Sequence, residues 1–320
     1  QERLFSTIVS VFFSYDNSHK DTESRTMHTA SINNVNHQTG HLAILLASFL
    51  WGTTGTVASL APDVSPLAIG AFAMGVGGLL QALVALKNLQ RDAKQLWQLK
   101  AYVAGGALGI AVYPLTFYSA MHLAGVAIGT VVTIGSAPFA TALLEWLISK
   151  KNSFNKTWLI SLSFGLLGIL LLAFSEAAPT QAAQSQWDTV IGIILGLVAG
   201  GSYALYAWIG KHMIEQGVHS KASMSSMFVV SACILLPSLA LTGEHLFASI
   251  NNISVALYMA AVPMFLGYVL FGFGLKTTHA STATVLTLFE PVVAAIFAVT
   301  IVGEHLGFSG WLGMALIGAC

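Results

Sequence analysis

Charged residues are scarce in this chain of 320 residues: Asp, Glu, Lys and Arg make up 8% of it, against 55% for hydrophobic residues. A soluble domain carries roughly 25% charged residues, so this chain has too few charges to cover a folded surface in water. The 13 Lys and Arg residues balance the 13 Asp and Glu residues. Without a positive excess there is no electrostatic footprint for nucleic acid. The composition therefore requires lipid as a partner and argues against nucleic acid.

Cysteine and the common catalytic motifs are also scarce. The two cysteines are Cys233, inside an apolar run, and Cys320, and no CxxC or Cys/His spacing indicates a metal site. No GxxxxGK[ST], HExxH or GxSxG pattern occurs, and no connection between apolar runs is long enough to hold a soluble catalytic domain. An intramembrane enzyme would need a convergent His/Asp/Ser cluster, which the sequence does not offer. We therefore expect no enzyme, no cofactor and no metal.

Ten long apolar runs make up most of the chain. A helix needs about 20 apolar residues to cross the ~30 Å hydrocarbon core of a bilayer. The runs are 42–61, 66–86, 101–121, 126–149, 157–175, 189–210, 222–242, 253–275, 280–302 and 307–320. The last run is too short to span at ~1.5 Å per residue, so we expect the tenth helix to be truncated in this sequence. The pattern predicts an all-α membrane protein with ten transmembrane helices.

Lys and Arg are confined to alternate connections. The basic connections are 87–100, 150–156, 211–221 and the one at Lys276. The connections without Lys or Arg are 62–65, 122–125, 176–188, 243–252 and 303–306. By the positive-inside rule, the N-terminus and the basic connections are cytoplasmic. We expect residues 1–41 to form a disordered cytoplasmic tail, with Met27 as a candidate natural start.

The two halves of the chain resemble each other. Pro138 and Pro291 are separated by the same interval as Trp158-Leu159 and Trp311-Leu312. Chance similarity between apolar segments is the alternative explanation. Because five helices are an odd number, a second copy would enter the membrane from the opposite side, as in the inverted repeats of many secondary transporters. The expected organisation is a first repeat over 42–175, an extracytoplasmic linker over 176–188 and a second repeat over 189–320.

Glycines recur every fourth residue on two runs. Gly192, Gly196 and Gly200 form one such ridge, and Gly105 and Gly109 form another. Small residues at this spacing let helix backbones approach closely in lipid. Ordinary close packing is the favoured interpretation, and a sliding contact is the alternative.

Glu290 lies halfway along the ninth run, where a charge costs on the order of 3 kcal/mol by insertion scales. Ser281, Thr284 and Thr287 precede it at steps of three, on one gently drifting helical stripe. Pro291 follows directly and removes a backbone donor. A polar stripe beside a broken helix is typical of a cavity wall. The alternative is a protonated Glu290 that ties two helices together.

The fourth run carries a related pattern. Thr133 and Ser136 stand at a step of three before Pro138, which favours a stripe facing the same interior as that of the ninth run. Glu145 lies near the cytoplasmic interface, five residues before Lys150. We expect its carboxylate to reach water or to pair with a basic residue of the following connection.

Aromatic residues are candidates for a binding wall. Trp51 and Thr53 lie in a polar break of the first run, Trp51-Gly52-Thr53-Thr54-Gly55. Tyr203 and Tyr206 share a face of the sixth run at a spacing of three. The other candidates are Tyr113, Tyr118, Trp208, Tyr258 and Tyr268. Packing between helices is the default role for most of them.

Several short motifs resemble the drug/metabolite transporter superfamily, in particular its EamA family. They are Leu50-Trp51-Gly52, Leu288-Phe289-Glu290-Pro291, Gly303-Glu304-His305-Leu306 and Trp311-Leu312-Gly313. The resemblance covers residues 42–320. It implies a bacterial inner-membrane carrier with a central cavity between two halves, often an exporter of amino acids, related metabolites or drugs. Relatives often carry an Arg early in the second helix, where this chain has Ala71-Phe72-Ala73-Met74.

The resulting hypothesis is a secondary transporter that exports small organic metabolites by alternating access. Glu290 would contact a substrate amine or carry a coupling proton. The candidate cavity residues are Glu290, Thr287, Thr284, Trp51, Thr53, Tyr113, Thr133, Ser136, Tyr203, Tyr206 and Tyr268. The alternative function is a non-transporting membrane sensor or assembly factor.

Overall fold

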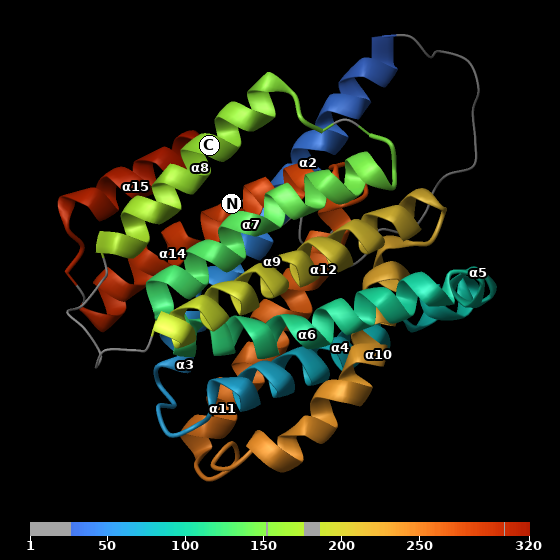
Figure 1. Ribbon diagram of the computed structural model, residues 1–320. Helices are drawn as coiled ribbons and strands as arrows, with labels where there is room; N and C mark the ends of the chain where they lie inside the picture. The colour runs from blue at the N-terminus through green and yellow to red at the C-terminus, as the bar shows by residue number, and fades with distance from the viewer. Residues whose placement is uncertain (1–26, 152, 176–185, 304) are drawn as a thin grey trace.

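The computed structural model describes residues 27–151, 153–175, 186–303 and 305–320, and these residues form a bundle of helices (Figure 1). Within these ranges, nine helices are long and apolar enough to cross a membrane, and a shorter apolar helix follows them. The expected all-α architecture of ten membrane helices is confirmed.

The first half of the bundle contains five spans. Its helices are α2 (Met27–Gly52), α3 (Thr54–Ala58), α4 (Pro66–Arg91), α5 (Ala93–Gln98), α6 (Lys100–Ala124), α7 (Val126–Leu147) and α8 (Lys156–Ser175). α2 and α3 together make the first span, and the short α5 lies between the second and third.

The second half repeats this plan with more irregular helices. Its regular helices are α9 (Gln186–Glu215), α10 (Ser220–Thr242), α11 (Ile250–Met259), α12 (Tyr268–Gly274), α13 (Ala280–Leu286), α14 (Glu290–Phe297) and α15 (Phe308–Ala319). The π-helix η1 (Ala260–Gly267) joins α11 to α12, the 3₁₀ turn η2 (Thr287–Phe289) joins α13 to α14, and the π-helix η3 (Ala298–Val302) follows α14.

The first helix begins earlier than the sequence predicts. α2 starts at Met27, so residues 27–41 are helical rather than part of a disordered tail. Extending an existing helix adds one backbone hydrogen bond for each residue that is fixed, so an apolar span can carry its helix outward into polar sequence. Residues 1–26, and residues 176–185 of the predicted linker, lie outside the described residues.

The packing of the helices shows the two-repeat organisation. Each of three pairs joins equivalent helices of the two halves: α4 packs on α10, α7 on α13, and α8 on α15. Figure 1 shows the last pair side by side at one edge of the bundle. The contact between α6 and α9 has its counterpart in the contact between α2 and α12. Reciprocal contacts of this kind are what a two-fold axis between two copies produces.

The basic connections come together at one end of the bundle, here called the basic end. Asp92 Oδ2 accepts a hydrogen bond of 2.7 Å from the His219 backbone N–H. Lys151 Nζ lies 2.7 Å from Glu215 Oε1, which joins the 150–156 and 211–221 regions. The alternation of charge along the sequence therefore becomes a segregation of charge in space.

The connections without Lys or Arg meet at the opposite end. Asn251 Nδ2 donates to Leu60 O over 2.6 Å, and Asn252 Nδ2 donates to Asp63 Oδ2 over 3.0 Å. These contacts join the segment after α3 to the start of α11.

The glycine ridge of α9 packs on the end of α6 and along α7. A Cβ added to Gly200 would lie 2.6 Å from Thr133 O, and one added to Gly192 would lie 2.6 Å from Ala124 N. Side chains at these positions would push the helices apart. Close packing accounts for this ridge, as expected.

Three spans are irregular at similar depth. The first is interrupted at Thr53, between α2 and α3, and the ninth narrows to the 3₁₀ turn η2 directly before Glu290. Both interruptions are where the sequence predicts them. The π-helix η1 in the eighth span, which contains Pro263, was not expected. Departures of this kind are frequent at functional sites.

Candidate functional site

A cavity of about 60 Å³, open at one side, lies between the two halves. Helices of both repeats contribute to it. The lining residues are Trp51, Thr54, Gly70, Ala73, Met74, Tyr113, Pro114, Phe117, Tyr118, Tyr203, Tyr206, Met259, Met264, Tyr268 and Glu290.

Among the described residues of the lining, Glu290 brings the one acidic side chain, from the middle of the span Ala280–Ile301. Its side chain is partly exposed to the cavity. Within the described part of the chain, no hydrogen bond or ion pair reaches its carboxyl group. A carboxyl group at this depth without a protein partner requires water, a proton or a ligand in the cavity.

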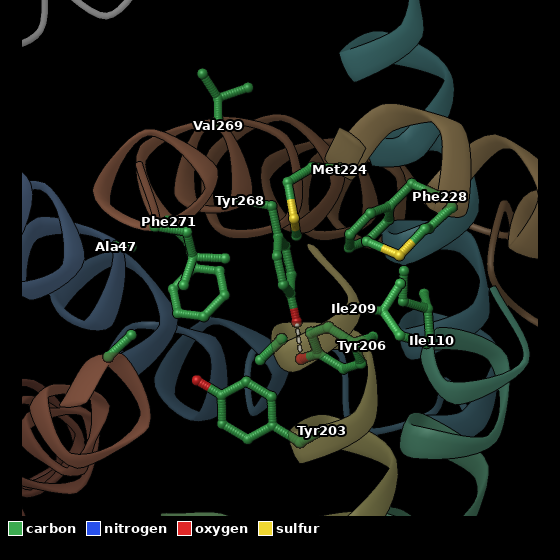
Figure 2. Packing of buried hydrophobic residues seen from close by; sticks show 14 of the residues in the cluster. Ala47, Ile110, Tyr203, Tyr206, Ile209, Met224, Phe228, Tyr268, Val269 and Phe271 are labelled. Carbon is green, nitrogen blue, oxygen red and sulfur yellow. Dashed lines mark hydrogen bonds between the residues drawn. The ribbon is translucent and has the colours of Figure 1, made fainter. Parts of the chain in front are cut away.

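Four buried aromatic side chains form the floor of the cavity: Trp51, Tyr203, Tyr206 and Tyr268, each no more than 7% exposed. The rings of Trp51 and Tyr268 are 4.7 Å apart at their centroids, and those of Tyr203 and Tyr206 are 5.2 Å apart. The hydroxyl groups of Tyr206 and Tyr268 share a hydrogen bond of 2.8 Å (Figure 2). The floor is therefore built from side chains of α2, α9 and α12.

Two side chains from the first half hold the irregular backbone of the eighth span. Trp51 Nε1 donates to Pro263 O over 3.0 Å, and Gln81 Nε2 donates to Met264 O over 3.1 Å. Both acceptors belong to η1. The π-helix is thus tied to α2 and α4 beside the cavity.

The wall above the floor is mainly aromatic and sulfur-containing. Tyr113 and Phe117 are stacked with centroids 5.6 Å apart, and Phe117 lies 5.5 Å from Tyr118. Met259 and Met264 line the cavity from the eighth span. Among the described residues, no partner accepts from or donates to the hydroxyl groups of Tyr113 and Tyr118, so both are available to a ligand.

The space between the floor and the basic end is filled. Ile110, Ile209, Met224, Phe228 and Phe271 are each no more than 3% exposed, and Figure 2 shows Ile110, Ile209 and Phe228 packed beside the Tyr206–Tyr268 pair. These residues come from the basic-end portions of α6, α9, α10 and α12. The cavity therefore lies toward the opposite end, and the path to the basic end is closed.

Charged side chains complete this closure. Lys211 Nζ donates to Leu275 O over 2.8 Å, at the end of α12, and lies 3.6 Å from Glu215 Oε1. A cation at a helix C-terminus is stabilised by the partial negative charge of the terminal carbonyl groups.

Glu145 does not have the predicted partner. Its carboxylate accepts hydrogen bonds from the Ala280 N–H at 2.8 Å and the Ser281 hydroxyl at 2.5 Å, and also one from the Ser153 hydroxyl. The expectation of water or a basic residue is therefore wrong. The N–H groups at the start of a helix have no intrahelical acceptor, and a buried carboxylate at that place satisfies them.

Six of the candidate residues from the sequence meet in the cavity: Glu290, Trp51, Tyr113, Tyr203, Tyr206 and Tyr268. Thr284 and Thr287 lie outside its lining, both buried. Thr287 Oγ1 accepts a hydrogen bond of 2.9 Å from the Tyr203 hydroxyl. Each step of three residues turns back about 60° around an α-helix, so the stripe drifts away from the face that carries Glu290.

Thr133, Ser136 and Thr53 also lie outside the lining. Thr133 and Ser136 face the α9 ridge, where Ser136 contacts Gly200. The Thr53 hydroxyl donates to Leu50 O over 2.7 Å and lies 3.0 Å from the Tyr258 hydroxyl. In its place, Thr54 lines the cavity.

Several lining residues carry no distinctive sequence signal. Gly70, Ala73 and Met74 follow the i, i+3, i+4 spacing of one helix face, which indicates a buried face but does not separate a cavity wall from a packed core. Phe117 could have been predicted from the sequence, because it lies four residues after Tyr113 and therefore on the same face of the helix. In the described ranges, no three His, Cys, Asp or Glu side chains are grouped as for a metal ion.

Known proteins resemble this chain over most of its length. An uncharacterized transporter, YwfM, of Bacillus subtilis is 35% identical over 278 residues, which cover 86% of this chain and 90% of that protein. A probable amino-acid metabolite efflux pump of Salmonella typhimurium is 27% identical over 88% of this chain and 90% of its own length. An uncharacterized inner membrane transporter, YicL, of the same species is 23% identical over 87% of this chain and 92% of its own.

A solved crystal structure shares the fold. It matches with a TM-score of 0.74 at 17% identity and covers 88% of this chain and 94% of that one. A model of the EamA-like transporter family matches residues 38–174 and again residues 190–319, one match in each half. The chain is therefore a multi-pass membrane protein that belongs to the EamA-like transporter family.

Proposed function

We propose that this protein is a secondary transporter that carries small organic metabolites out of a bacterial cell across the inner membrane by alternating access. The observation that carries the proposal is the cavity between the two halves, which is closed toward the basic end and holds Glu290 at mid-span, where no described residue pairs with its carboxyl group. Cavities at the interface of two repeats are where secondary transporters bind their cargo.

Alternating access follows from the relation between the halves. In this state the cavity lies toward the opposite end, while aromatic, aliphatic and charged side chains close the basic end. Two halves of the same fold and opposite orientation can exchange their conformations. This exchange would close the present opening and separate the aromatic side chains of the floor. The Tyr206–Tyr268 hydrogen bond and the contacts of Lys211 are the interactions that must then break.

The basic end is the cytoplasmic end in this proposal, because Lys and Arg are retained on that side of a membrane. The N-terminus is cytoplasmic as well, and the cavity faces the outside of the cell in the present state. The probable amino-acid metabolite efflux pump among the similar proteins supports amino acids or related compounds as cargo and export as the direction.

Glu290 carries a coupling proton in this proposal. The sequence offers no P-loop for ATP, so the free energy must come from a gradient of cargo or of an ion. A carboxyl group that meets the cavity without a fixed partner can bind a proton from one side of the membrane and release it to the other.

Flux measurements in proteoliposomes test the proposal. The purified chain would be reconstituted and offered radiolabelled amino acids and their amine derivatives, with and without an imposed pH gradient. We expect uptake driven by that gradient for a subset of the panel, and its loss in Glu290→Gln. Glu244→Gln is the matched control because its side chain is 87% exposed and lies outside the cavity.

Two outcomes would contradict the proposal. Unchanged flux in Glu290→Gln at every pH would remove the proton-coupling role. Absence of flux for the whole panel, together with stable retention of a partner protein, would favour the sensor or assembly role.

A further inference from the structure

We infer that the cavity selects organic cations, with an amine or quaternary ammonium head beside Glu290 and against the aromatic floor. The inference rests on the proposed function and names its substrate class. It predicts that amines are preferred over the corresponding zwitterionic amino acids.

The charge of the lining is the first argument. Among the described residues that line the cavity, Glu290 is the acidic one, and none is Lys, Arg or His. Ala73 and Met74 occupy the wall contributed by the second span. An anionic group in the cavity would meet a like charge without a compensating cation, whereas an ammonium group would be paired at low dielectric.

The aromatic rings are the second argument. Trp51 lies 4.7 Å from Tyr268 and 6.5 Å from Tyr203, and Tyr113 lies 6.0 Å from Tyr203, measured between ring centroids. A cation is attracted to the face of an aromatic ring within about 6 Å of its centroid. At these spacings, a compact cationic head that contacts one ring is within reach of its neighbours.

The polar atoms of the floor are the third argument. The Trp51 N–H is bound to Pro263 O, and the Tyr203 hydroxyl is bound to Thr287. The hydroxyl groups of Tyr206 and Tyr268 bind each other. The single bond between the Tyr206 and Tyr268 hydroxyl groups uses one of their two hydrogens, so the floor offers a carboxylate at most one donor, whereas it offers an ammonium head several ring faces.

The wall formed by the second and eighth spans determines which apolar groups of a ligand the cavity accepts beside the charged head. Met74, Met259 and Met264 all line the cavity. Methionine side chains are flexible and polarisable and adapt to different apolar shapes. The cavity is therefore selective for the charged head and permissive for the apolar body attached to it.

Binding of four probes of matched shape tests the inference. Phenethylamine, phenethyl alcohol, 3-phenylpropionate and phenylalanine share one ring on a short chain and differ in charge. Their affinities would be measured by isothermal titration calorimetry on the full chain purified in detergent. We expect phenethylamine to bind about tenfold more tightly than each of the other three.

Variants assign the preference to its sources. Glu290→Gln should abolish the preference for the cation, whereas Glu244→Gln should keep it. Tyr113→Leu should weaken phenethylamine binding about fivefold, and Tyr113→Phe should restore it, because the ring rather than the hydroxyl attracts the cation. Weakening by Tyr113→Phe as strong as that by Tyr113→Leu would contradict the role of the ring.

The result that would overturn the inference is separate from failure of the transport proposal. Equal binding of the four probes, tighter binding of 3-phenylpropionate, or no binding of phenethylamine would each overturn cation selectivity, even if vesicles transport other compounds. Cation-selective binding without any flux in vesicles would support the inference and overturn the transport function instead.

Discussion

Glu145, near the end of α7, accepts a hydrogen bond of 2.8 Å from the backbone N–H of Ala280, the first residue of α13. The same carboxylate is only 2% exposed and also accepts from Ser281. The fourth span of the first repeat thus caps the N-terminus of the fourth span of the second repeat. Negative charge near the N-terminus of a helix is stabilised by the helix dipole.

Removal of this carboxylate should weaken the fold. We expect Glu145→Ala to lower the free energy of unfolding by about 2 kcal/mol, because it leaves buried N–H and hydroxyl donors without an acceptor. Glu145→Gln should cost less, since its amide oxygen can still accept from Ala280. Thermal unfolding of the purified chain in detergent measures both. An unchanged midpoint in Glu145→Ala would show that water replaces the carboxylate.

Two lysines at the basic end should differ sharply in their contribution to the free energy of unfolding. The Lys211 side chain is 11% exposed and holds the end of α12, whereas the Lys151 side chain is 40% exposed. We expect Lys211→Met to lower the free energy of unfolding by about 2 kcal/mol. Lys151→Ala should change it by less than about 1 kcal/mol, as for exposed ion pairs. Equal effects in the same unfolding assay would contradict this reading of the network.

Adjacent glycines on α9 offer a matched pair. A Cβ at Gly200 would lie 2.6 Å from Thr133 O, whereas one at Gly201 would have no atom of the described residues within 4 Å. Gly200→Ala should destabilise the protein by about 1–3 kcal/mol through overpacking. Gly201→Ala should stabilise it by up to about 1 kcal/mol, because alanine favours the helix. The unfolding midpoints of the two variants should therefore move in opposite directions, and movement in the same direction would argue against tight α7–α9 packing.

His219, in the connection between α9 and α10, should make stability depend on pH. Burial lowers its pKa to about 4, helped by the positive charges of Lys276, Arg91 and Lys221 and opposed by Asp92. Its neutral Nδ1 accepts a hydrogen bond of 3.2 Å from the Lys221 N–H at the start of α10.

Because the folded state disfavours the charged imidazole, its contribution to stability is complete above the unfolded pKa of about 6.5 and is lost as the pH falls toward 4. His219→Asn retains a side-chain cap that does not titrate. As the pH is lowered from 6.5 to 4, we expect the thermal unfolding midpoint of the original chain to decrease. The midpoint of His219→Asn should decrease less over the same range. Parallel curves for the two proteins would show that His219 is not responsible.

The sequence predicts the membrane architecture well because each span must be apolar over its whole length and every second connection carries Lys or Arg. It also identifies Glu290, since an acidic residue in the middle of a span is conspicuous. These features depend on composition at a given depth, which can be read without knowledge of how a helix is rotated.

The sequence does not determine how each helix is rotated about its axis or which helices it contacts. Thr284 and Thr133 were expected at the cavity, but each turns toward another helix, because a step of three does not keep a constant face. The π-helix η1 depends on donors that Trp51 and Gln81 supply from more than 180 positions away in the chain. Met259 and Met264 are indistinguishable from core residues until the cavity beside them is seen.

The double role of Trp51 affects how mutants of this protein should be interpreted. Its ring belongs to the cavity floor, while its N–H supports the backbone at Pro263. A phenotype of Trp51→Ala therefore mixes loss of ligand contact with collapse of a scaffold in another helix. Gln81 supports the adjacent carbonyl of Met264 from outside the cavity lining. Gln81→Leu thus reproduces the scaffold defect alone, and subtracting its effect isolates what the indole ring contributes to recognition.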